Sequence, residues 1–402
     1  MTIAIHNTRL IDGAGAVIEH ATVIIRDTTI ATVGTIKDVA VPRGATRVDG
    51  RGFTLLPGLI DCHVHLCLGG EADVVETITR EAPALTLLKS SCAARQTLEA
   101  GFTTVRDVGA RDHSIFALKH AVDTGLVPGP RIVGAGLAIC MVGGHARFIG
   151  QEVAGTDQVR TVVRAQIAAG AEVIKVIASG GVLTAGTLPD QAQMTPEELR
   201  AAVEEAQRAG RKVAAHAHGA SGMKNAINAG AHSIEHATLM DEDAAVLMKQ
   251  HGVFMVPTLS ALATTAACRP GCGIPENALE KAKAMTQRHA ASFKKAHRSG
   301  ILIAMGTDAG TPFNYHGENA QELDRMVAFG MSPMEAIMAS TSAAARLIGI
   351  QDHVGTITKG KTADLVVFDG DPLRRIELLR DRNRIAGVMQ AGKFVAGPLS
   401  RT

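Results

Sequence analysis

The sequence of 402 residues contains no tryptophan and a single tyrosine, which removes most of the aromatic platform on which unpaired nucleobases stack. It also lacks a charge surplus, because 41 lysines and arginines oppose 39 acidic residues and leave a net charge of +2. No long block of one charge sign occurs. These absences argue against an electrostatic footprint for nucleic acid, and we expect no nucleic-acid partner.

Long apolar runs are absent as well. No stretch of about 18 apolar residues exists that would span a bilayer, and the first residues, MTIAIHNTRLIDGAG, lack the basic and apolar segments of a secretory signal. The six cysteines are scattered, and their spacing does not suggest a disulfide framework. We expect a cytoplasmic protein without a membrane partner, in which Cys268 and Cys272 are thiols of a plain loop rather than a metal site.

The middle of the chain alternates between two patterns. Apolar runs rich in β-branched residues are separated by amphipathic helical patterns, such as the one that starts at Thr195 and Pro196, closes a capping box at Glu198 and stops at Gly210. Eight runs occur, at residues 59–63, 102–106, 131–135, 172–176, 212–216, 233–237, 253–257 and 301–306. Eight strand–helix units in about 300 residues predict an α/β fold, a (β/α)8 TIM barrel over residues 58–356.

Both ends of the chain are instead rich in short β-strands. Residues 1–57 contain several strands separated by Gly, Asp and Thr, and residues 357–402 contain ADLVVFD and a hairpin that turns at Ala391 and Gly392. Because the two ends of a barrel lie near each other, we expect these segments to meet. They are predicted to form one small composite β-sandwich domain.

Polar residues follow five of the eight runs. His63 and His65 close the first run in LLPGLIDCHVHLCLGG, and residues two apart share one face of a strand. The other runs contribute Lys175, His216, His236 and Asp308. One such histidine alone is usually a hydrogen-bonded rim residue, but six polar residues at the active end of a barrel are not explained that way. Imidazole and carboxylate groups predict a site for zinc or a similar divalent ion.

These residues lie in motifs that resemble the amidohydrolase superfamily. The motifs are PGLIDCHVHL, VIKVIASGG, AAHAHG, SIEHA and GTDAG, and GTITKGKTADLVVFD resembles the C-terminal signature. The similarity is greatest to the imidazolonepropionase-related branch with Xaa-Pro dipeptidases and ochratoxin-type amidohydrolases. The resemblance implies two divalent ions, which we expect to be zinc. It also implies a homo-oligomer.

The resemblance further implies a ligand set. His63, His65 and Asp308 would bind the more buried ion, His216 and His236 the more exposed one, and Lys175, carboxylated by carbon dioxide, would bridge both. A carbamate supplies an oxygen to each ion, whereas an ammonium group would repel them. His216 and His218 could both face the site. The family pattern favours His216, which leaves His218 as a substrate contact or a residue behind the ligands.

The implied reaction is hydrolysis of the amide or peptide bond of an N-acyl amino acid or dipeptide, prolidase-like or ochratoxin-type. A metal-bridging hydroxide would attack the carbonyl and Asp308 would transfer the proton. Alternatives on the same scaffold are a cyclic amide, carbamate, urea or lactone hydrolase, or a deaminase. A non-catalytic scaffold normally loses ligands, and none is missing here. No GxSxG motif indicates a serine nucleophile.

Five residues are candidates for substrate contacts. His145, in CMVGGHARFIG after the third run, is predicted to contact the substrate carbonyl or carboxylate, as a Gly-Gly-His does in dipeptidase relatives, or else to be a solvated loop residue. Arg106 offers a bidentate fork to a substrate carboxylate, with a structural pair to Asp107 or another acid as the alternative. Tyr315 and His316, which follow Asp308, are predicted to form a wall of the pocket, and His218 completes the set.

Overall fold

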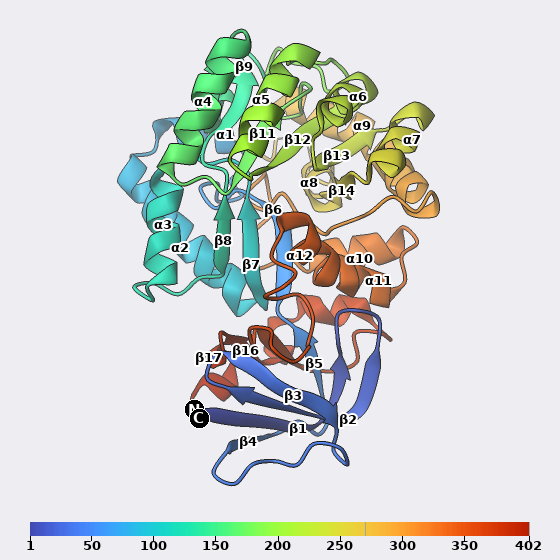
Figure 1. The fold of residues 1–402 in the computed structure, drawn as a ribbon. Helices are drawn as coiled ribbons and strands as arrows, with labels where there is room; N and C mark the ends of the chain where they lie inside the picture. Colours follow the sequence, from blue (N-terminus) through green and yellow to red (C-terminus); the bar gives the residue numbers. More distant parts are fainter. Residues whose placement is uncertain (270, 402) are drawn as a thin grey trace.

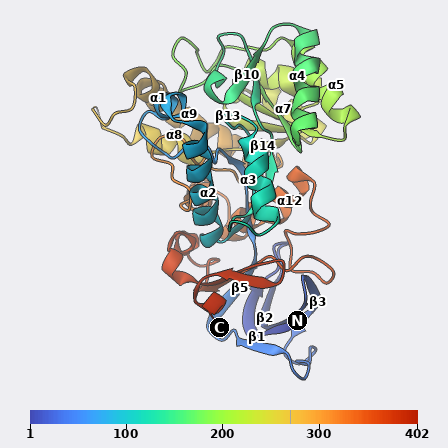
Figure 2. The same ribbon diagram turned by 90° about the vertical axis from the view of Figure 1, so that its left-hand side faces the viewer.

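The computed structural model describes residues 1–269 and 271–401. Two parts are visible in two perpendicular views (Figures 1 and 2): a β-rich part that contains both chain ends, and a larger part in which helices surround parallel strands. Within the described residues, no helix is both long enough and apolar enough to cross a bilayer.

The β-rich part is one eight-stranded sheet with the order β17-β16-β15-β5-β1-β2-β3, in which β4 also pairs with β1. Its strands are β1 (Thr2–Ile11), β2 (Val17–Arg26), β3 (Thr29–Thr35), β4 (Thr46–Asp49), β5 (Phe53–Pro57), β15 (Leu365–Asp369), β16 (Ile385–Gln390) and β17 (Lys393–Ala396). The antiparallel pair of β5 and β15 joins the two ends of the chain. The two ends therefore meet, as expected, while the domain boundaries stay a prediction.

Alternation along the strands explains how this sheet contacts the rest of the chain. Leu55 and Val367 belong to a core on one face of the sheet. Their neighbours Leu56 and Val366 point to the other face and pack into the large core of the helical part. Successive side chains point to opposite faces, so a strand that is apolar at every position is buried on both sides. The sheet is thus packed against the part that carries the site.

The predicted hairpin turn is confirmed between β16 and β17. Ala391 and Gly392 have φ angles of 46° and 77°. A Cβ atom on Gly392 would lie 1.9 Å from the carbonyl oxygen of Asp27. Glycine is therefore required at this position for its backbone angle and for space.

Seven of the eight predicted runs form strands, and every pair between them is parallel. One sheet contains β6 (Leu59–Val64), β7 (Phe102–Asp107) and β8 (Arg131–Gly134). The other contains β9 (Ala138–Met141), β10 (Gly150–Val153), β11 (Val173–Ile177), β12 (Lys212–Gly219), β13 (Ser233–Leu239) and β14 (Phe254–Val256). An α/β fold with parallel sheets places the carboxyl ends of these strands at one edge of the structure.

The eighth run, residues 301–306, is not a regular strand, which corrects the prediction. It makes only an isolated parallel bridge, Ile303 to Met255 of β14. On its other side, the Met305 carbonyl accepts from the Cys62 amide at 2.9 Å and the Asp308 amide donates to the His63 carbonyl at 2.7 Å. The segment lies between β14 and β6 with too few bonds for a ladder, and it brings Asp308 beside His63.

Helices follow most strands, and the predicted helix after Thr195 is confirmed with its capping box. The helices are α1 (Val74–Arg80), α2 (Pro83–Glu99), α3 (Ser114–Asp123), α4 (Thr156–Ala169), α5 (Pro196–Arg208), α6 (Ala220–Ala229), α7 (Glu242–His251), α8 (Leu259–Ala266), α9 (Glu276–Arg298), α10 (Gln321–Ala328), α11 (Pro333–Ala339) and α12 (Ser342–Ile348). They cover the outside of the parallel strands (Figure 1).

Cys268 and Cys272 form a disulfide, so the expectation of two thiols is wrong. Their Cα atoms are 6.3 Å apart, within the range that a disulfide spans. The loop between the helices α8 and α9 brings them together, which a spacing of four residues does not reveal. The other four cysteines are free thiols.

Candidate active site

The six predicted ligands line one cavity at the carboxyl ends of the parallel strands, together with His145 and His218. Four of the ligands lie within the strands β6, β11, β12 and β13, whereas His65 follows β6 and Asp308 follows the eighth run. All six side chains are buried. Among the described residues, two groups could hold a metal ion, and in each group the ligand atoms lie within 4.8 Å of one another.

The first group consists of His63, His65 and Asp308. The Nδ1 atoms of both rings are engaged: that of His63 contacts Glu235 at 2.8 Å and that of His65 contacts the Gly109 carbonyl at 2.8 Å. Both Nε2 atoms therefore face the Asp308 carboxylate, at 3.4 and 3.2 Å. Burial alone would raise the pKa of Asp308, but the two rings outweigh it and hold that pKa well below its ordinary value.

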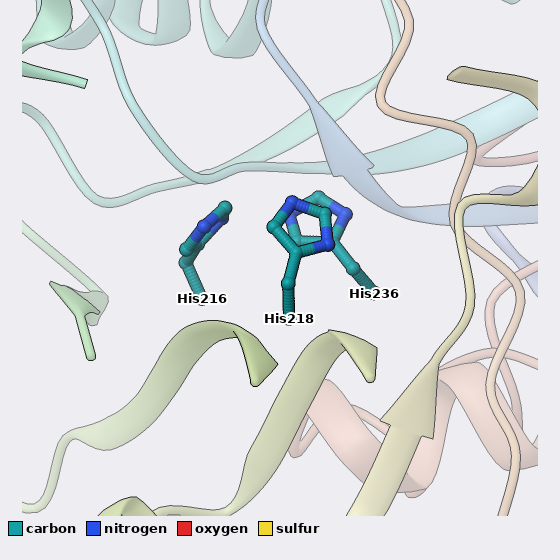
Figure 3. Close-up of side chains that lie close together, drawn as sticks. All are labelled: His216, His218 and His236. Carbon is teal, nitrogen blue, oxygen red and sulfur yellow. The ribbon is translucent and has the colours of Figure 1, made fainter. Parts of the chain in front are cut away.

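The second group consists of His216, His218 and His236 (Figure 3). The rings of His218 and His236 stack with centroids 4.7 Å apart, and the ring of His216 stands edge-on to both. The Nδ1 atoms of His218 and His236 contact the hydroxyls of Thr238 and Thr258. Their Nε2 atoms are thus the ones left for a ligand. The geometry brings His218 into the group beside His216 and does not favour either as the ligand.

Burial and the neighbouring rings lower the pKa of all three histidines in this group well below the ordinary value. They are therefore neutral at physiological pH, which is the state in which imidazole binds metal. The two groups adjoin, because the ring centroids of His63 and His236 are 5.0 Å apart.

Lys175 lies in the same cavity and belongs to neither group. Its Nζ atom is buried and has no hydrogen-bond partner, which is rare for an ammonium group with three donors. Burial lowers the pKa of Lys175 to about 8. An orphaned and readily deprotonated amine beside two ligand groups fits a site that is completed by carboxylation and by two cations.

Arg106 does not reach the cavity, so its predicted contact with substrate is wrong. It is buried, with Nε donating to the Cys62 carbonyl at 2.6 Å and NH2 donating to both oxygens of Glu235 at 2.9 and 3.0 Å. Arg106 therefore forms the structural ion pair that was the alternative, with Glu235 as its partner. Its donors are used inside the fold, below the rim.

Sequence reasoning missed Glu235, which orients His63. Its Oε2 atom faces the Nδ1 atom of His63 at 2.8 Å. Burial opposes ionisation, but the charge of Arg106 outweighs it and lowers the pKa of Glu235. A carboxylate next to a histidine in the apolar run SIEHA was the available signal, because an acid in a buried strand needs a charged partner.

We expect Arg106→Met to destabilise the protein by about 3–5 kcal/mol, because it leaves the Glu235 carboxylate buried without a counter-ion. Denaturant unfolding of the purified variant measures this loss. The double variant Arg106→Met/Glu235→Leu is the control, and it should regain much of the stability since no unpaired charge remains. A single variant as stable as the wild type would contradict this account of the pair.

Sequence reasoning also missed Asp61 and Glu322. Both carboxylates accept hydrogen bonds from backbone amides of segments that border the cavity. Asp61 accepts from the Thr307 amide and hydroxyl, at 3.1 and 2.6 Å, and so ties β6 to the segment before Asp308. Glu322 accepts from the first two amides of α8, at 2.7 and 2.8 Å. It caps this helix in place of Thr258, whose hydroxyl contacts His236 instead.

The remaining predicted contacts divide into two sets. His145 lines the cavity, with its ring centroid 4.7 Å from that of His216. Tyr315 and His316 do not line it, so their predicted place in the pocket wall is wrong. Asn314 Nδ2 donates to the carbonyls of Thr307 and Asp308, which folds the chain back. His316 consequently lies behind the 65–68 turn, where Nε2 contacts two carbonyls, and Tyr315 is 42% exposed.

A profile of the Amidohydrolase family matches residues 54–395, most of the chain. The chain belongs to the amidohydrolase family. It is 32% identical to an ochratoxinase from Aspergillus niger, over 97% of this chain and 85% of that protein. An imidazolonepropionase from Rubrobacter xylanophilus is 25% identical, over 92% of this chain and 90% of that protein. The crystal structure of a Xaa-Pro dipeptidase with bound methionine in the active site has a TM-score of 0.92 and 34% identity, covering 99% of this chain and 100% of that chain.

These similarities confirm the predicted family and branch. This amidohydrolase is an enzyme, a hydrolase that acts on C–N bonds. Its α/β fold with parallel sheets is similar to the structures of other amidohydrolases. The histidine-rich groups described above are its candidate metal sites.

Proposed function

We propose that this amidohydrolase uses two divalent metal ions, taken to be zinc, to cleave the amide bond of an N-acyl amino acid or dipeptide. The observation that carries the proposal is the pair of adjoining ligand groups with the unpartnered Lys175 amine beside them. The similarity to an ochratoxinase and a Xaa-Pro dipeptidase supports the same bond class. We further propose that the parallel strands close into a (β/α)8 barrel over residues 58–356. Residues 1–57 and 357–402 would form the composite β-sandwich domain, with the eight-stranded sheet folded over onto itself.

The ligands divide between the ions in this proposal. His63, His65 and Asp308 hold one ion, and His216 and His236 hold the other. Lys175, as a carbamate, would be the ligand that the two sets share. When bound, such a pair of ions supplies an acidified water and polarises the substrate carbonyl. His218 lines the same cavity, and its Nε2 atom would be left to contact substrate.

The side chains of the site then have defined tasks. Asp308 stays ionised because its pKa is held low, so its carboxylate accepts the proton of the attacking water and passes it to the leaving nitrogen. The Thr184 hydroxyl accepts from the Ala146 amide at 3.2 Å and contacts His145 Nδ1 at 2.9 Å. This contact occupies Nδ1 of His145 and leaves Nε2 as the ring nitrogen that would donate to a substrate oxygen.

The cavity walls indicate an apolar acyl group. Beyond the proposed ligands and the two further histidines, the lining consists mostly of aliphatic and aromatic side chains, including Leu68, Phe148, Ile149, Val182, Leu183 and Leu262. With Arg106 paired to Glu235, the described residues that line the cavity offer a substrate carboxylate histidines and threonine hydroxyls but no arginine. That observation favours the second candidate class, neutral carbamates, ureas, lactones or cyclic amides, more than the sequence alone did.

The test is hydrolysis of a panel of N-acyl amino acids and dipeptides by the metal-loaded enzyme, each assayed beside its C-terminal amide. We expect the free acids to be preferred. His145→Ala should lower their kcat/KM roughly 10–150-fold, which corresponds to the loss of about 1.5–3 kcal/mol from one hydrogen bond to a charged group. The amides should lose less in this variant. Equal kcat/KM for acids and amides would overturn carboxylate recognition and leave the neutral substrates.

A further inference from the structure

The segment that follows β11 forms one wall of the cavity. Val182 and Leu183 line the cavity directly. Gly181 lies against His145 so closely that a Cβ atom there would be 2.2 Å from Nε2 of that ring. The position of this short loop, residues 181–184, therefore sets both the apolar wall and the space around His145.

A lysine from a distant helix holds this loop. Nζ of Lys281, in α9, donates to the carbonyls of Gly181 at 3.2 Å, Val182 at 3.2 Å and Thr184 at 2.9 Å. An ammonium group has three donors, so all of them are used on one loop. The three acceptors lie within four consecutive residues, which fixes the backbone more firmly than single bonds to separate segments.

Among the described residues, no carboxylate pairs with the charge of Lys281. Burial lowers its pKa, so the site bears a desolvation cost that a lysine with a carboxylate partner avoids. Lys281 is half-buried, and the dipoles of the three carbonyls compensate part of this cost. A half-buried charge whose three hydrogen bonds all go to the wall of the cavity indicates a role in holding that wall.

Thr184 transmits the position of the loop to His145. Its carbonyl accepts from Lys281, and its hydroxyl contacts both the His145 ring and the Ala146 amide. Thr187 closes the loop on itself through the Gly181 and Thr184 carbonyls, at 3.4 and 3.1 Å. A shift of the loop therefore moves His145 together with Val182 and Leu183.

We propose that Lys281 is a positioning residue that determines which substrates bind, by holding the 181–184 loop against the cavity. It acts on substrate binding and not on the metal ligands, since all three of its hydrogen bonds go to this loop. The effect on substrates rests on the proposed function of the cavity as the acyl-binding site. The effect on the loop does not.

The experiment compares Lys281→Met, which keeps length and removes the donors, with Lys281→Arg, which keeps charge and donors. Lys283→Met is the matched control, an exposed lysine two residues along the same helix. Lys281→Gln is used if Lys281→Met does not fold. Metal content, kcat and KM are measured on an N-acyl amino acid with a bulky apolar acyl group and on its N-acetyl counterpart, and amide hydrogen exchange is measured over residues 180–187.

We expect Lys281→Met to keep the wild-type metal content and most of kcat. KM for the bulky substrate should rise by roughly tenfold or more, the size of one lost hydrogen bond to a charged group, with a smaller rise for the N-acetyl compound. Exchange at 180–187 should become faster, Lys281→Arg should restore part of both effects, and Lys283→Met should match the wild type.

Two results would overturn the inference: unchanged KM and exchange in Lys281→Met, or loss of metal in this variant, which would show a general structural role. The exchange measurement separates this inference from the proposed function. If the wild type hydrolyses none of the panel, the proposed substrate class is wrong, and exchange at 180–187 in Lys281→Met still decides whether Lys281 holds the loop.

Discussion

Lys175→Ala is expected to lose both metal binding and most of the catalytic rate. The variant removes the group proposed to bridge the two ions, and without it the two ligand groups hold only imidazoles and one carboxylate. Replacing residues that merely support metal ligands costs roughly 10–100-fold, so loss of a bridging ligand should exceed that range. Elemental analysis of purified protein gives the metal content, close to two ions per chain in the wild type, and steady-state assays give the rate.

A small carboxylic acid added at high concentration provides the control for this variant. Its carboxylate can occupy the space left by the lysine and supply an oxygen to each ion, so part of the activity and metal content should return. The same acid should not stimulate the wild type. Lys175→Ala that keeps two metals per chain and the wild-type rate would rule out the bridging role.

Asp308→Asn is expected to lower kcat by about 10²–10⁴-fold, the usual contribution of general acid–base catalysis. The substitution is isosteric and keeps an oxygen near His63 and His65, so the fold should persist. It removes the low-pKa carboxylate that is proposed to move the proton. The measurements are kcat, metal content and the dependence of kcat on pH, whose acidic limb should change.

Asp107→Asn is the matched control for Asp308→Asn. The Asp107 carboxylate is also buried at a strand end, but it accepts from the amides of Leu66 and Gly109 and does not line the cavity. We expect this variant to lose stability with a smaller effect on kcat. A loss of less than tenfold in Asp308→Asn would assign proton transfer to another residue, with His218 as the next candidate.

The apolar runs and the polar residues near their ends predicted much of the fold and most of the residues of the cavity. Seven of the eight apolar runs form parallel strands. A strand that is buried on both faces needs a continuous apolar sequence, so it can be recognised from the sequence alone. The six proposed ligands meet in one cavity, because residues at the carboxyl ends of parallel strands share an edge. The eighth run has the same apolar composition, yet it forms only an isolated bridge with β14.

Most of the errors concern side chains whose partners are distant in sequence, and one concerns two cysteines only four residues apart. The guanidinium group of Arg106 could bind either a substrate carboxylate or the carboxylate of Glu235, which is 129 residues away. Only the packing of the strands shows that Glu235 is its partner. Tyr315 and His316 follow Asp308 closely, but the turn held by Asn314 places them behind the 65–68 segment. Cys268 and Cys272 were read as thiols because spacing alone does not reveal whether a loop brings two sulfurs together.

The sequence by itself determined the family, the bond class and the residues at the strand ends, because motifs and side-chain periodicity are local properties of the chain. The tertiary structure alone decided that His218 joins His216 and His236, that Glu235 orients His63, and that Lys281 holds the 181–184 loop. Each of these contacts joins segments that are separate in sequence. Their geometry depends on how strands and helices pack, and a hydrogen bond forms only when packing brings donor and acceptor to within about 3 Å.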